Sequence, residues 1–112
     1  MVDFVENRVC IRQLQGKGTT LLIPKTCGIG SILITQTGQN TLITLYAEDP
    51  DGNVAVIAQT SDKTFSHSFR RCLELWRGSN IFINVEDTYT LVNICIEYEE
   101  RVYAKTYNRW RN

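Results

Sequence analysis

The sequence lacks the features that mark a membrane protein or a secreted precursor. No apolar run in its 112 residues approaches the ~20 that a membrane-spanning helix needs, and no lipidation pattern is visible. The first ten residues, MVDFVENRVC, place acidic residues among the first apolar ones, which is not typical of a secretory signal. We therefore expect a chain without a signal peptide or a transmembrane segment, and no membrane partner.

Charge of one sign is not in excess either. Twelve basic residues balance twelve acidic ones, so the formal net charge is +0. Without an overall positive field the chain has no general attraction for nucleic acid, and we do not expect nucleic acid as its partner. Zero net charge also removes the repulsion that keeps copies apart, which favours self-association.

Cysteine is present but is not arranged as a motif. The four residues are Cys10, Cys27, Cys72 and Cys95. They form no C-x-x-C pair, so the sequence indicates neither a zinc site nor a redox motif, and we expect no cofactor. We expect each to be a small core residue with a reduced thiol, although two disulfides remain an alternative in an oxidising compartment.

Helical periodicity is scarce. Only residues 66–77 fit a 3.6-residue spacing, so a short helix is an alternative there. Elsewhere turn signals recur at the intervals of an all-β sandwich. They lie at residues 16–18, 28–30, 37–40, 50–53, 61–63 and 78–80.

About nine short segments between these turns are rich in β-branched and aromatic residues. They span 9–14, 19–24, 31–36, 41–49, 54–60, 64–69, 72–77, 81–85 and 89–98. Because no helical stretches separate them, we predict an all-β fold: an antiparallel β-sandwich, jelly-roll-like, of about nine short strands. The length fits a single β-sandwich domain over residues 1–112.

Local patterns predict one hairpin and two buried faces. Pro50 presets one backbone angle and Gly52 accepts a positive φ, so residues 50–53 are expected to form a hairpin turn. In 64–69, alternation places Phe65, His67 and Phe69 on an inward face and the serines on the other. In 89–98 it predicts a buried side of Val92, Ile94, Ile96 and Tyr98.

The candidate catalytic and metal-binding groups are weak. His67 is flanked by Ser66 and Ser68, but both serines are expected on the opposite face, so we interpret it as a buried, hydrogen-bonded histidine. The stretch from Asp49 to Asn53 begins like a calcium loop, yet its glycine falls two places early and its twelfth residue is Thr60. The glycine pairs at 16–18 and 28–30 are too short for phosphate-binding fingerprints. Glu97, Glu99 and Glu100 are expected to be a solvated strand end. We therefore expect no catalytic or metal-binding residues, and we do not expect the protein to be an enzyme.

Residues 101–112 form a basic and aromatic C-terminal strand or tail that contains no acidic residue. Arginine and aromatic side chains are common in binding hot spots, so one interpretation is a contact strip. Its candidate binding residues are Tyr103, Lys105, Tyr107, Arg109, Trp110 and Arg111. The other interpretation is a final strand whose aromatic residues pack on the sandwich while the basic ones face solvent.

From about Ser31 to Glu99 the chain resembles the small jelly-roll domains that bacteriophages use as head-decoration and fibre modules. The pieces that carry the likeness are S-I-L-I-T-Q, T-L-I-T-L-Y-A-E-D, P-D-G-N followed by V-A-V-I-A-Q-T, I-F-I-N-V and L-V-N-I-C-I-E-Y. The resemblance implies a capsid- or fibre-associated structural role in the virion, often as a homotrimer, with no catalytic residues. The partner would then be a protein such as a capsid lattice.

We therefore expect a non-enzymatic structural or binding protein of a virion, acting through protein–protein contacts as a homo-oligomer. Two alternatives stay open. One is a carbohydrate-binding or lectin-like module in which Trp76 or Trp110 stacks on a sugar. The other is a phage-type inhibitor that binds a nucleotide signal or a host protein. Its anion contacts would be Arg101, Lys105, Arg109 and Arg111.

Overall fold

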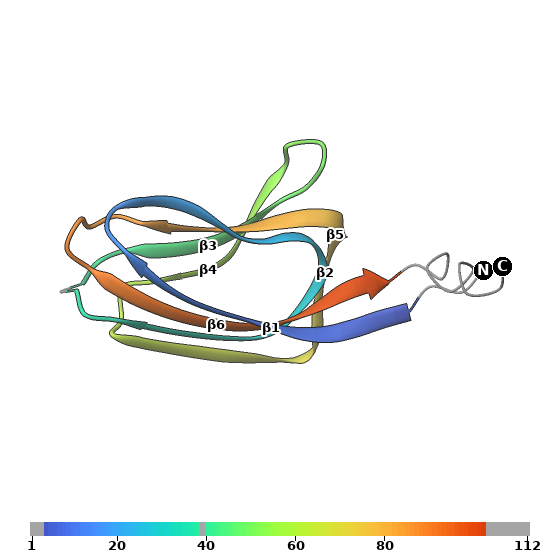
Figure 1. Ribbon diagram of the computed structural model, residues 1–112, viewed down its shortest axis with the longest axis horizontal. Helices are drawn as coiled ribbons and strands as arrows, with labels where there is room; N and C mark the ends of the chain where they lie inside the picture. The colour runs from blue at the N-terminus through green and yellow to red at the C-terminus, as the bar shows by residue number, and fades with distance from the viewer. Residues whose placement is uncertain (1–3, 39, 103–112) are drawn as a thin grey trace, which may run out of the picture.

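The structure is a computed structural model that describes residues 4–38 and 40–102, without the side chains of Phe4, Trp76, Arg77 and Val102. Within these ranges the regular structure is all β (Figure 1). The strands are β1 (Phe4–Gln15), β2 (Gly18–Gln36), β3 (Ile43–Glu48), β4 (Val54–Thr60), β5 (Thr64–Val85) and β6 (Leu91–Val102). In this part of the chain no helix is long and apolar enough to cross a membrane.

The strands form one antiparallel sheet in the order β1-β6-β2-β5-β3-β4. β2 and β5 are long enough for the first and second parts of each strand to pair with different neighbours. The second part of β2, 28–36, pairs with β6 and with the first part of β5, whereas its first part, 18–26, pairs with the last part of β5. That last part of β5 also pairs with β3. The sheet therefore has two four-stranded halves that share β2 and β5.

The connectivity of the two halves is that of a jelly roll. Taking the parts of β2 and β5 separately gives eight segments along the chain. One half has the order β1, β6, second part of β2, first part of β5, which is 1-8-3-6. The other is first part of β2, second part of β5, β3, β4, which is 2-7-4-5. Interleaving of this kind builds a jelly-roll sandwich, as the sequence predicts.

The sheet folds over where β2 and β5 bend, at one end of the molecule (Figure 1). The bend in β2 contains Pro24 and Lys25, whose φ is 53°, and the ladder has register shifts from Leu21 to Ser31. Across from it, Gly78 in β5 has a φ of 82°. Proline and left-handed residues interrupt a regular ladder without ending the strand.

This bending corrects the sequence predictions for two turns, for a helix and for the number of strands. The turns expected at 28–30 and 78–80 lie inside β2 and β5, and Ile29 is fully buried. The helix considered at 66–77 is part of β5. The structure therefore has fewer and longer strands than predicted: β2 spans two of the predicted segments and β5 spans three.

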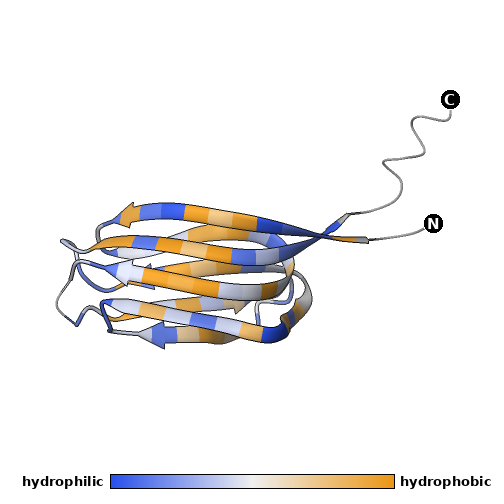
Figure 2. Cartoon of the chain, turned by 90° about the horizontal axis from the view of Figure 1, so that it is seen from below, coloured by the Kyte–Doolittle hydropathy of each residue, from blue (hydrophilic) through white to orange (hydrophobic). Residues whose placement is uncertain are grey.

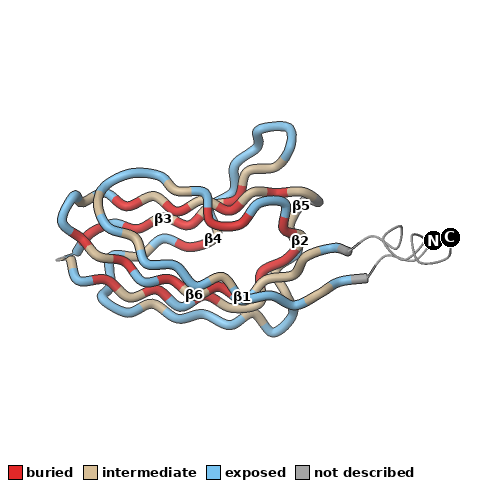
Figure 3. Tube along the Cα trace, in the orientation of Figure 1, coloured by how far each residue is buried: buried red, intermediate tan, exposed pale blue. Residues whose placement is uncertain are grey.

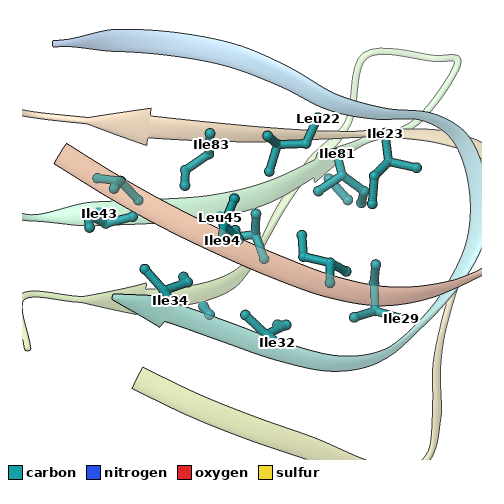
Figure 4. Packing of buried hydrophobic residues seen from close by; sticks show 14 of the residues in the cluster. Leu22, Ile23, Ile29, Ile32, Ile34, Ile43, Leu45, Ile81, Ile83 and Ile94 are labelled. Carbon is teal, nitrogen blue, oxygen red and sulfur yellow. The ribbon is translucent and has the colours of Figure 1, made fainter. Parts of the chain in front are cut away.

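The core lies between the two halves, and its side chains point toward one another from both (Figure 4). Buried positions alternate with more exposed ones along the strands (Figure 3), and hydrophobic residues alternate with more hydrophilic ones (Figure 2). Val92, Ile94 and Ile96 of β6 are at most 1% exposed, and Tyr98 packs half-buried beside them. The predicted inward face of this segment is therefore confirmed.

The predicted hairpin at 50–53 is confirmed and joins β3 to β4. The Asp49 amide donates to the Asn53 carbonyl, and the Gly52 amide donates to the Asp49 carbonyl. Gly52 has the positive φ, 86°, that such a turn requires. The described parts of the connections, 16–17, 37–38, 40–42, 61–63 and 86–90, gather at the opposite end of the sandwich (Figure 1).

Candidate interaction surfaces

The predicted contact strip cannot be placed on the fold. Its residues, Tyr103, Lys105, Tyr107, Arg109, Trp110 and Arg111, lie outside the described residues, as does the side chain of Trp76. Arg101, which precedes the strip, is exposed near the end of β6 and lines a surface groove with Glu74 and Glu99. The strip therefore stays a prediction.

His67 is exposed, so its predicted burial is wrong. The alternation itself is confirmed, because His67 lies opposite the buried Ile32 while Ser66 lies opposite Leu33 on the outer face. The first part of β5 is at the edge of the sheet, where β2 is its one flanking strand among the described residues, and Phe65 and Phe69 on the same face pack against the core. The imidazole packs edge-on against Phe69 with ring centroids 4.5 Å apart. Both neighbouring serines point away from it.

The cysteines are free and half-buried, not core residues in the full sense. Two of them lie near Glu99: the Cys27 Sγ is 3.4 Å from the Glu99 carbonyl oxygen, and Cys72 interacts with the Glu99 carboxylate. Burial, followed by this carboxylate, raises the pKa of both thiols. Burial likewise raises the pKa of Cys10. Thiols held protonated in this way are poor nucleophiles and poor metal ligands.

The Asp49 carboxylate is occupied by its own turn. It accepts hydrogen bonds from the Asp51 amide at 2.9 Å, the Asn53 amide at 2.9 Å and the Asn53 side chain at 3.0 Å. The bond from the Asn53 side chain is the largest cause of its lowered pKa. The carboxylate thus caps the hairpin and does not open toward a cation. Among the described residues no group of three or more acidic, histidine or cysteine side chains could hold a metal ion.

The three glutamates at the end of β6 differ from one another. Glu97 is exposed and accepts a hydrogen bond from the Ser31 hydroxyl at 2.8 Å. Glu100 pairs with Arg8 of β1 at 2.6 Å. Glu99 is half-buried beside Gly28, where a Cβ would come 2.6 Å from its carboxylate oxygen. Two of the three therefore belong to local polar pairs on the β1-β6-β2 surface, as a solvated strand end would.

An apolar row crosses the outer face of the half built from β2, β5, β3 and β4. Residues directly opposite on antiparallel strands share a face, and the register runs Leu21 to Phe82, Phe82 to Tyr46 and Tyr46 to Val56. We call these residues the four-strand row. Leu21 is 43% and Val56 61% exposed, and the rings of Tyr46 and Phe82 stack at 5.3 Å. One apolar side chain from each strand thus reaches this surface.

Uncharged polar side chains flank the four-strand row on one side. Thr19 donates a hydrogen bond to Asn84 at 2.9 Å, and Gln59 donates to Thr44 at 3.0 Å. On the other side lie Asn80 and Glu48, which are also opposite one another. Because neighbouring pairs satisfy each other's polar groups, the row stands out as an apolar strip with a mainly neutral border.

A shorter row crosses the outer face of the other half. Ile11 of β1 lies opposite Cys95 of β6, and Cys95 lies opposite Leu33 of β2. These three residues line a shallow groove, with Ile11 75% exposed. Glu97 and Ser31 border it on one side, and Gln13 donates to Asn93 at 3.0 Å on the other. Each row is therefore bordered mainly by neutral polar side chains and by one glutamate, Glu97 here and Glu48 beside the four-strand row.

A buried polar cluster holds the loops together at the end opposite the bends. The Gln36 side-chain amide donates to the Thr41 carbonyl at 3.0 Å and to the Asp62 carbonyl at 2.9 Å. The Thr41 and Thr90 hydroxyls are 2.9 Å apart, and each also lies within hydrogen-bond distance of the Asp87 carboxylate, at 3.3 Å and 3.1 Å. Hydrogen bonds from the Tyr89 amide, and next from Thr90, lower the pKa of the Asp87 carboxyl. The groups named above are paired with one another, whereas the Gln36 side-chain oxygen is buried without a hydrogen-bond partner among the described residues.

Both rows were missed from the sequence. Each joins residues from strands that are distant along the chain, and only the register brings them side by side. The available signal was an apolar residue on the polar side of an alternating strand, as at Leu33 and Val56. Comparison with protein-family models finds no matching family, and comparison with curated proteins finds no similar sequence.

Proposed function

We propose that this protein is a non-enzymatic structural module of a virion, a capsid-decoration or fibre-associated protein that binds other proteins through its outer sheet faces. The observation that carries the proposal is the four-strand row. Isolated apolar residues on a surface are ordinary, but a continuous strip rimmed by polar side chains is typical of an interaction surface. The jelly-roll strand order and the resemblance of residues 31–99 to phage modules support the virion context.

The proposal includes self-association, since the chain has a formal net charge of +0. The resemblance implies three copies.

A test is cosedimentation of the purified protein with particles of the virus that encodes it. Replacing Leu21 by Asp places a charge in the middle of an apolar contact, and we expect particle binding to weaken by about tenfold or more. The matched control is Thr19→Asp, two residues away on the same face of the same strand. The proposed contact would be refuted if the wild-type protein did not bind the particles, or if both variants lost particle binding equally.

The stacked pair of Tyr46 and Phe82 favours a second candidate, a carbohydrate-binding module. Two aromatic rings on a sheet face can stack on a sugar ring. Binding of the wild-type protein to a glycan array, lost in Tyr46→Ala and kept in Leu33→Ala, would support this function over the first.

A further inference from the structure

β4 is an edge strand of the sheet. It comes last in the strand order and pairs with β3 through residues 54–60, and no described strand pairs with its other side. A row of backbone amide and carbonyl groups on an edge is a template for another strand. Val54 and Val56 are 58% and 61% exposed there.

The other three edges carry groups that discourage such pairing. β1 contains Glu6, Arg8 and Arg12, and the first part of β5 contains Arg70 and Arg71. The first part of β2 ends in Pro24 and Lys25. Charged residues and proline on an edge are the usual protection against strand addition.

β4 has none of these groups. Its sequence, VAVIAQT, contains neither a charged residue nor proline. The β3–β4 ladder has one register shift: Leu45 lies opposite Ala58 and Tyr46 opposite Val56, so Ile57 is the extra residue of a bulge in β4, and the pairs from Val54 to Val56 are regular. Among the four edges of the described structure, β4 is thus the one without charge or proline, and its regular stretch beside β3 runs from Val54 to Val56.

We propose that a second copy of this chain pairs with β4, β4 against β4, about a two-fold axis perpendicular to the sheet. An uncharged strand can pair with a second copy of itself without electrostatic repulsion. A two-fold axis brings the two copies of an edge together, so any charge on that edge would face a like charge. Self-pairing of β1 or of the first part of β5 would bring arginines together. The chain as a whole adds no repulsion, since its formal net charge is +0.

The pairing also joins the two outer faces. With the axis perpendicular to the sheet, the four-strand row of one copy ends at Val56 beside the Val56 side of the other. β4 has seven residues, and the regular stretch from Val54 to Val56, before the bulge at Ile57, would carry the new ladder. Because an edge contact is smaller than the ~1,600 Å² of a standard interface, the dimer forms and dissociates with concentration.

The test is sedimentation equilibrium of the full-length wild-type protein across a concentration series, compared with two variants. Val56→Lys places like charges side by side on the shared face, and we expect the dimer dissociation constant to rise by about tenfold or more. Ile11→Lys introduces the same charge at a more exposed position on the β1 edge and should leave dimerisation unchanged. Val56→Thr keeps a neutral β-branched residue and should retain the dimer.

Hydrogen exchange of the wild-type protein gives a second measurement that does not depend on any variant folding. Amides of residues 54–60 should become more protected as concentration rises, while those of β1 should not. A wild-type protein that stays monomeric, forms a trimer, or dimerises equally well with Val56→Lys would overturn the pairing.

The inference goes beyond the proposed function and can fail separately. Particle binding that is lost in Leu21→Asp but accompanies a monomeric wild-type protein would support the virion proposal and refute the β4 pairing. A β4-dependent dimer that does not bind particles would support the β4 pairing and refute the virion proposal.

Discussion

Gly38 shows how a single residue depends on the polar cluster at the loop end. A Cβ at this position would lie 2.3 Å from both the Thr41 and the Thr90 hydroxyl oxygens and 3.0 Å from the side-chain amide oxygen of Gln36. Both threonines are nearly or fully buried and bonded to each other. The backbone at 38 has no positive φ, so the requirement for glycine comes from packing and not from backbone conformation.

We expect Gly38→Ala to lower the free energy of unfolding by about 1–3 kcal/mol, because the added methyl group must push apart hydrogen-bonded hydroxyls. Urea denaturation followed by circular dichroism would measure the loss. Gly30→Ala is the matched control, since its Cβ would meet its nearest atoms at 3.5 Å and 3.6 Å, which are ordinary contacts. Equal stability of the two variants would contradict the packing argument.

At the scale of elements, β2 shows how one strand serves two surfaces. Ile32 and Ile34 are 2% and 1% exposed in the core, whereas Leu33 between them is 45% exposed on the outer face. The strand can hold both because its side chains alternate with a period of two. A shift of one residue in its register would exchange the core and the surface.

Replacing neighbouring residues of β2 by alanine should therefore have very different effects. We expect Ile34→Ala to cost about 2–5 kcal/mol of unfolding free energy, because it leaves a cavity in the core. Leu33→Ala should cost about 1 kcal/mol or less, since much of this side chain is already in solvent. Thermal or urea unfolding of both variants measures the difference. Similar losses would mean that the two faces of β2 are not distinct as described.

For the whole molecule, the distribution of charge matters more than its sum. Both rows are bordered mainly by neutral side chains, whereas Glu97 and Glu99 lie near the end of β6. Residues 101–112 follow directly from this acidic end and contain four basic residues and no acidic one. The basic tail therefore adds a second charged region to a chain whose sum is zero.

If residues 103–112 form a contact strip, deleting them should weaken particle binding by about tenfold or more. The melting temperature should then change by less than ~4 °C, because the described core would remain intact. Cosedimentation and a thermal melt on the same preparation measure the two effects. A comparable loss of binding and stability would instead identify the segment as part of the packed sheet.

Much of the local structure could be predicted from the sequence, because it depends on neighbouring residues. Alternation identified the buried side of β6, and Pro50 with Gly52 identified the β3–β4 hairpin. Glycine was less informative. Glycine can end a strand, but at Gly28 and Gly78 it lets the strand bend and continue. Which of the two happens depends on whether the partner strands continue alongside the glycine.

The sequence by itself determined that the chain is β-rich, which residues alternate on each segment, and that its formal charges sum to zero. Only the tertiary structure decided which segments lie at an edge. This is why His67 faces inward in register and is still exposed, and why β4 is open while the core strands are covered. Edges and cross-strand rows depend on pairings between residues far apart in the chain, and no local pattern records these pairings.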